Sequence, residues 1–82
     1  MYKNLIVNYI KNMTMEDVNS FIEKNNIEIS EKDKRVIFNH IKKYYNVFFN
    51  DPIKYIKMLK GSIDDNIYYE VLTLYDKYKD KL

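Results

Sequence analysis

Residues 14–44 decide the fold and read TMEDVNSFIEKNNIEISEKDKRVIFNHIKKY. Two stretches of apolar residues at helical spacing lie on either side of Ile27-Glu28-Ile29, which alternates apolar, polar and apolar side chains. This alternation predicts a short extended connector at 27–29 with both isoleucines pointing inward. No other segment offers a partner strand for so short a piece. The stretch therefore predicts a helix, an extended linker and a second helix.

Capping residues predict where these two helices begin and end. Thr14, followed by Asp17 three residues later, has the spacing of a capping box, and Ser30 with Asp33 repeats it at the second helix. The Asn pair at 25–26 suits the left-handed backbone in which helices often end. Each cap contributes about 1 kcal/mol to stability. The ends of these helices are therefore better specified than their interiors.

Similar signals extend the helical pattern in both directions. Apolar spacing predicts a helix over about 2–12, and Asn46-Val47-Phe48-Phe49 is expected to be a hydrophobic connector tucked under the domain. Pro52 suits the first position of a helix that Asn50 or Asp51 caps. Gly61 is expected to end that helix with a left-handed backbone, and Ser62 to cap a last helix that runs almost to the C-terminus.

The apolar stripes of these helices predict the core. The positions expected to face inward are Leu5, Ile6, Tyr9, Ile10, Met13, Met15, Val18, Phe21, Ile22, Val36, Ile37, His40, Ile41, Tyr44, Ile53, Ile56 and Leu59. The last helix carries two neighbouring rows, namely Ile63, Ile67, Val71 and Leu74 beside Tyr68, Leu72, Tyr75 and Tyr78. The predicted fold is all-α, a compact orthogonal bundle of four to five short helices that forms a single domain over residues 1–82.

Length and composition exclude several classes of protein. The chain has 82 residues and no cysteine, so disulfides and thiolate metal sites are excluded and apolar packing must supply the stability. No stretch approaches the roughly 20 apolar residues of a membrane span, and the N-terminus does not read as a signal peptide. We expect a cytoplasmic protein.

Residues able to carry out catalysis are scarce. His40 is the single histidine, no acidic residue lies three or four positions from it, and it is expected at the edge of the core. The acidic pairs at 16–17 and 64–65 fall in first helical turns, where the helix dipole favours negative charge. With one glycine, no phosphate-binding loop can be built. We expect no enzyme, metal, cofactor or small-molecule substrate.

The distribution of charge is less even than the net charge of +2 indicates. Residues 31–61 sum to +5, whereas residues 1–30 sum to −1 and residues 62–82 to −2. A candidate nucleic-acid face on the third and fourth helices comprises Lys34, Arg35, Lys42, Lys43, Lys54, Lys57 and Lys60, with Tyr45 or Tyr55 available to stack on bases. The alternative is a solvated lysine face without a ligand. The excess of Lys, Asn, Ile and Tyr, whose codons are AT-rich, indicates a low-GC genome that would enrich lysine in any case. We favour this alternative.

Tyrosine is abundant enough to suggest a second kind of surface. The chain has nine tyrosines and four phenylalanines, more than short helices can hide completely, and tyrosine is enriched at protein interfaces. A candidate partner patch comprises Tyr45, Tyr55, Tyr69 and Tyr78. The alternative is that these rings lie at the core edge with their hydroxyls in water.

A family resemblance covers nearly the whole chain. It rests on Thr14-Met15-Glu16-Asp17-Val18 through Phe21, Asn25-Asn26-Ile27-Glu28-Ile29-Ser30, Phe38 to Lys43, Pro52, and Leu74-Tyr75-Asp76-Lys77-Tyr78-Lys79. In these features the chain resembles small all-helical proteins of unknown function from low-GC Gram-positive bacteria. The resemblance implies a bacterial cytosolic setting and no known activity. It assigns no functional residues.

Two functions follow as hypotheses. The first is a non-enzymatic protein-interaction module that binds a protein partner or forms a homodimer through exposed tyrosines and the C-terminal helix. The alternative is a weak nucleic-acid-binding domain that uses the basic face on its third and fourth helices.

Overall fold

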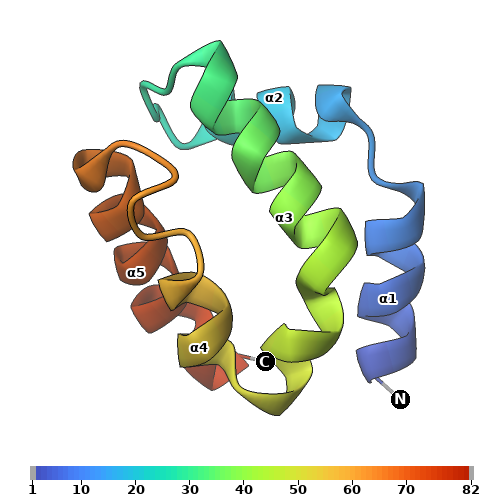
Figure 1. The fold of residues 1–82 in the computed structure, drawn as a ribbon. Helices are drawn as coiled ribbons and strands as arrows, with labels where there is room; N and C mark the ends of the chain where they lie inside the picture. Colours follow the sequence, from blue (N-terminus) through green and yellow to red (C-terminus); the bar gives the residue numbers. More distant parts are fainter. Residues whose placement is uncertain (1, 82) are drawn as a thin grey trace.

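The computed structural model describes residues 2–81, which form a small all-α bundle of five helices (Figure 1). These are α1 (Tyr2–Asn12), α2 (Met15–Lys24), α3 (Glu31–Asn50), α4 (Pro52–Lys57) and α5 (Asp65–Tyr78), followed by a 3-10 turn at Lys79–Lys81. The predicted fold class is confirmed. Within residues 2–81, no helix has the length and apolar character needed to cross a membrane.

Helix α3 is the central element of the bundle. Figure 1 shows α1 beside it on one side and α5 on the other, while α2 lies across its N-terminal end and α4 packs near its C-terminal end. The connector at 27–29 brings the chain from α2 into α3 without forming a strand, as the alternating pattern predicts. Helix α1 runs along the C-terminal half of α3, where Lys42 contacts Lys11 and Lys3 lies over the ring of Phe49, whereas α2 and the start of α5 lie near the N-terminal end of α3.

Most helix ends lie where the capping residues predict. Thr14 and Asp17 form a complete capping box, and the Ser30 hydroxyl accepts a hydrogen bond from the backbone N–H of Asp33. The chain leaves α2 through Asn26, whose φ of 54° is left-handed. Gly61 has the expected left-handed backbone, with a φ of 84°. It does not end α4, however, because that helix stops at Lys57 and its C-cap is Met58, whose backbone is right-handed. The capping predictions for α2 and for the start of α3 are confirmed.

Two further expected boundaries are wrong. Residues 46–49 are not a connector, because α3 continues to Asn50 and bends only at Tyr44, where φ is −117° and ψ is 15°. No residue in this segment breaks a helix, so α3 continues until Asp51 and Pro52 stop it and start α4. Ser62 does not cap the last helix. Asp64 does so, by accepting a hydrogen bond from the N–H of Asn66.

The buried core is small and lies at the α4–α5 end of the molecule. Its buried apolar residues within the described chain are Ile56, Leu59, Ile63 and Tyr68. Val36, Ile37, Tyr55, Ile67, Val71, Leu72 and Tyr75 pack around them and are partly buried.

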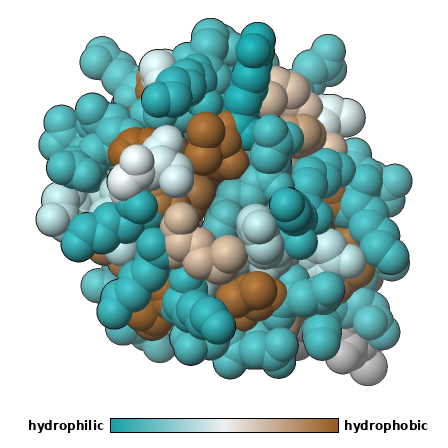
Figure 2. Space-filling view, in the orientation of Figure 1, coloured by the Kyte–Doolittle hydropathy of each residue, from teal (hydrophilic) through white to brown (hydrophobic). Residues whose placement is uncertain are grey.

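Four residues expected in the core are exposed instead, namely Leu5, Tyr9, Phe21 and Ile53. They sit on stripes that face no opposing helix closely enough to be covered. Figure 2 shows hydrophobic side chains emerging between the hydrophilic ones on one face of the molecule. The bundle therefore leaves part of its apolar surface open.

Candidate functional site

The apolar residues of α5 lie in two rows. Tyr68 is buried in the core, and Leu72 and Tyr75 pack against the core cluster. The second row, Ile67, Val71 and Leu74, points about 100° away around the helix and lines a cavity of about 300 Å³, although Ile67 and Val71 also contact the core cluster. Glu70 of α5 lines the cavity as well, and its other walls come from α1, α2, the segment between them, the connector and α3, and comprise Tyr9, Met13, Asp17, Val18, Phe21, Ile22, Ile27, Ile29, Lys34, Ile37 and Ile41. We call this cavity the groove.

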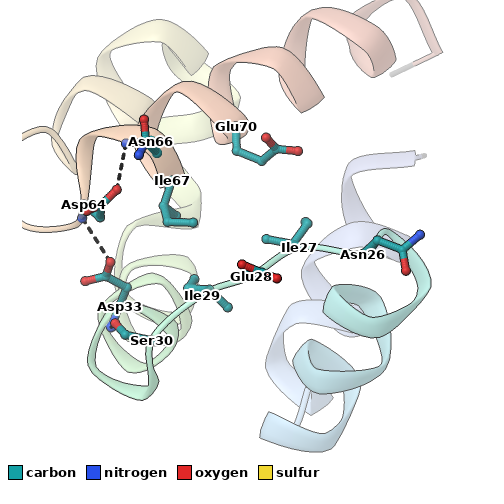
Figure 3. A pocket seen from close by; sticks show the side chains of 10 residues that line it. All are labelled: Asn26, Ile27, Glu28, Ile29, Ser30, Asp33, Asp64, Asn66, Ile67 and Glu70. Carbon is teal, nitrogen blue, oxygen red and sulfur yellow. Dashed lines mark hydrogen bonds between the residues drawn. The ribbon is translucent and has the colours of Figure 1, made fainter.

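The connector forms one mouth of the groove. Ile27 and Ile29 face Ile67 of α5 across the opening, and Glu28 and Glu70 stand beside them (Figure 3). These residues also line a polar hollow of about 690 Å³ that continues the groove outward. The inward-pointing isoleucines predicted at 27 and 29 therefore cover an open channel and not a closed core.

The opposite mouth lies between α1 and α2. Tyr9 and Phe21 line the groove there and are nevertheless 62% and 46% exposed. With Asp17 and Glu23 they also line a second hollow of about 550 Å³. The groove is thus apolar and opens into a hollow at each end, one by the connector and one by α2.

Hydrogen bonds fix several charged groups around the groove. The Asp17 carboxylate accepts from the Thr14 N–H at 2.8 Å. The Asp33 carboxylate, which is buried, accepts from the Asp64 N–H at 3.0 Å and so ties the start of α5 to the start of α3. The Lys34 ammonium pairs with Glu31 at 2.9 Å. That pair lowers the pKa of Glu31, first through the hydrogen bond and then through charge attraction.

His40 lies in the part of the bundle away from the groove. Its Nε2 is 2.7 Å from the carbonyl oxygen of Tyr55, and because a carbonyl can only accept, the ring donates through Nε2–H. The rings of Tyr44 and Tyr55 lie 5.3 and 4.4 Å from it, centroid to centroid. Burial lowers the pKa of His40, and the hydrogen bond to Tyr55 opposes that shift more weakly. The ring is therefore a structural link between α3 and α4.

The lowered pKa of His40 predicts a loss of stability in mild acid. The unfolded chain binds a proton near the ordinary pKa of about 6.5, whereas the folded chain resists protonation until a lower pH. Stability is therefore full above about pH 6.5, falls as the pH drops through that value, and levels off below the folded pKa. Urea unfolding at about pH 7.5 and about pH 5.5 measures the difference. The variant His40→Gln should show a smaller difference, and equal stability of the natural protein at both values would contradict the assignment.

The structure does not bring the seven residues of the candidate nucleic-acid face together. Lys34 pairs with Glu31, lines the groove, and has a side chain only 13% exposed. Lys43 lies nine residues later on α3, on the opposite side of the helix. The Lys42 ammonium donates to the Lys11 carbonyl of α1 at 3.0 Å. The remaining members, which are exposed, are Arg35, Lys43, Lys54, Lys57 and Lys60.

The candidate tyrosine patch is also divided. Tyr55 packs between His40 and Phe48, and burial raises its pKa far above the ordinary value, so it does not lie at an exposed edge. Tyr45 is partly buried. Tyr69 and Tyr78 are exposed, but they lie nine residues apart on α5 and point to opposite sides of that helix. The four rings therefore do not form one surface.

Sequence reasoning missed the groove, although it named most of the residues that line it. Its apolar members were read as core positions because apolar spacing identifies the buried side of a helix and not what covers that side. One signal was present in the sequence, namely the two neighbouring apolar rows of residues 63–78. A helix with so wide an apolar surface needs more than one partner, and in the structure the second row borders both the core cluster and the groove.

Comparisons with known proteins identify no relative from which a site could be inferred. The chain matches no protein-family model, no curated protein and no solved structure. Among residues 2–81, no group of three or more His, Asp or Glu side chains is placed to hold a metal ion. The groove is therefore the candidate site on the strength of its geometry alone.

Proposed function

We propose that this protein is a non-enzymatic protein-interaction module that binds its partner in the groove. The observation that carries the proposal is the groove's lining, which is almost entirely apolar and ends in the exposed rings of Tyr9 and Phe21. Aromatic anchors beside an apolar depression are typical of protein interfaces. The side chains that line the groove offer mainly apolar contact area. Their titratable groups are Asp17, Lys34, Glu70 and the phenol of Tyr9.

The molecule exposes more surface than a monomer of its mass usually does, which supports the proposal of an unoccupied interface. Its accessible surface is 6237 Å². A folded monomer of 10.1 kDa is expected to expose about 5,300 Å². The excess, about 900 Å², is close to the roughly 800 Å² that each partner contributes to a standard protein–protein interface. One partner of ordinary size would therefore cover the surplus.

Nucleic-acid binding is the second candidate, and the observation that favours it is a row on the exposed side of α3. Lys32, Arg35, Asn39 and Lys43 follow one another at spacings of three and four, without an acidic residue among them. Such a row suits phosphate contacts. We rank it second because Tyr45 and Tyr55, the rings expected to stack on bases, are partly buried.

Filling the groove should abolish binding without unfolding the protein. We expect Val18→Phe, which adds a ring inside the groove, to remove the affinity for an amphipathic helical peptide with a leucine face and a glutamine face. Its thermal stability should match or exceed that of the natural protein, because the ring occupies existing space. Fluorescence anisotropy of the labelled peptide measures the affinity, and circular dichroism the stability.

Thr73→Phe is the matched control, because it adds the same ring on the exposed side of α5, outside the groove. It should bind the peptide as the natural protein does. If Val18→Phe and Thr73→Phe bind equally, or if the natural protein binds no peptide, the groove is not a binding site. Light scattering of the same three proteins over a range of concentrations tests whether a second copy occupies the groove.

A further inference from the structure

We propose that the occupant of the groove is a basic amphipathic helix of another protein, with an apolar side that enters the groove and lysine or arginine residues along its edges. This inference rests on the proposed function and adds the chemistry of the partner. It is carried by the charge around the groove and by the hydrogen-bonding character of its lining.

The free charges at the mouth of the groove by the connector are negative, namely Glu28 and Glu70. The hollow by α2 is mixed, because Glu23 and Lys24 both line it. The three glutamates are exposed, and no lysine or arginine in the described part of the chain forms an ion pair with them. Asp17, in contrast, is occupied as a helix cap. Glu28 and Glu70 thus remain available to a partner's cations, whereas Lys24 offsets the charge of Glu23.

Apart from Lys24 and Lys34, no lysine or arginine of the described chain lines the groove or its two hollows. Lys34, the one cation in the wall of the groove, is already paired with Glu31. On α3, Ile37 and Ile41 face the groove, while Arg35 and Lys43 lie two residues away and therefore point about 160° from them. Electrostatic complementarity therefore favours a basic occupant. A second copy docking the same face symmetrically would set acidic rim against acidic rim.

The lining also favours a helix over an extended peptide. An extended backbone must have hydrogen-bond partners for its N–H and C=O groups when it is buried. The groove is walled by four helices and by the connector at 27–29, which is too short to pair with a whole strand, and the described part of the chain holds no strand that could do so. A helix satisfies its backbone internally and fills a groove with side chains spaced three and four residues apart.

Three labelled peptides of about 16 residues, long enough to hold a helix when bound, test the inference. All share a leucine face, and their polar faces carry lysine, glutamine or glutamate. We expect the lysine peptide to bind the natural protein about tenfold more tightly than the glutamine peptide at low salt, with the glutamate peptide weakest. Raising the salt to about 0.5 M should remove most of this difference through screening.

Reversing the charge at the rim provides the second measurement. The double variant Glu28→Lys and Glu70→Lys should lose the preference for the lysine peptide and bind the glutamate peptide more tightly. The control is Glu16→Lys, which changes an acid of α2 outside the groove. It should bind the three peptides in the same order of affinity as the natural protein. If the glutamine or glutamate peptide binds as tightly as the lysine peptide, and Val18→Phe still abolishes binding, the basic partner is wrong and the interaction module stands. If no peptide binds, or binding persists in Val18→Phe, the proposed function itself fails.

Discussion

Replacing Ile56 by alanine is expected to lower the free energy of unfolding by about 2–5 kcal/mol. Ile56 is 2% exposed and lies in the cluster with Leu59, Ile63 and Tyr68. Removing its methyl groups leaves a cavity that the surrounding helices can only partly close. Small domains have total stabilities near the lower end of the usual range of about 5–15 kcal/mol, so this change should leave the protein close to unfolded.

Ile53→Ala on the same helix is the matched control for Ile56→Ala. Ile53 is 42% exposed, so losing the same atoms there should change stability by no more than about 0.5 kcal/mol. Urea unfolding monitored by circular dichroism compares the two variants. If they destabilise the protein equally, the α4–α5 cluster is not the centre of the core.

The helix ends were predictable from the sequence because capping is a local interaction. Thr14 reaches Asp17, and Ser30 reaches the N–H of Asp33, over three residues whatever the rest of the chain does. Gly61 adopts the expected left-handed backbone, but it lies four residues beyond the end of α4 and is not its C-cap. Where local signals compete, the prediction fails. Both Ser62 and Asp64 are residue types that cap helices. In the structure Asp64 caps the last helix, and its own N–H donates a hydrogen bond to the Asp33 carboxylate.

The end of α3 and the groove could not be predicted, because both depend on contacts between distant residues. Phe48 stays in the helix and lies 5.4 Å from Tyr55 and 6.4 Å from Tyr75, measured between ring centroids. No feature of residues 46–49 in the sequence indicates those partners. Apolar spacing likewise identifies Tyr9 and Phe21 as lying on the apolar side of a helix, without indicating that both remain exposed in the folded bundle.

Neither candidate surface keeps all of its members on one side of a helix, for a simple geometric reason. Lys34 with Lys43, and Tyr69 with Tyr78, are each separated by nine residues, which places them on opposite sides of one helix. The net charge of residues 31–61 shows that this segment is basic, but it does not indicate which side of each helix carries the charge. The basic row of α3 and the acidic rim of the groove are distinguished only by the angle at which each side chain projects from its helix.

Replacing Asp33 by alanine is expected to lower the free energy of unfolding by about 1–3 kcal/mol. The carboxylate of Asp33 is buried and accepts the backbone N–H of Asp64, 31 residues away in sequence. Among the described residues it makes the one side-chain hydrogen bond that joins α3 to the start of α5. Alanine leaves that N–H without its partner, and the loss of an acid from the first turn of α3 adds a smaller cost.

Two further variants separate this tertiary bond from a general effect of charge. Asp33→Asn keeps an oxygen that can accept from Asp64, so it should retain more stability than Asp33→Ala. Glu31→Ala removes an acid from the same helical turn, together with an ion pair whose carboxylate is exposed, and should cost less than Asp33→Ala. Because α5 forms one wall of the groove, Asp33→Ala should also weaken binding of the uncharged, glutamine-faced peptide, whereas Glu31→Ala should leave the binding of that peptide unchanged. If the two alanine variants are equally stable, apolar contacts alone hold α5 in place, and the width of the groove does not depend on Asp33.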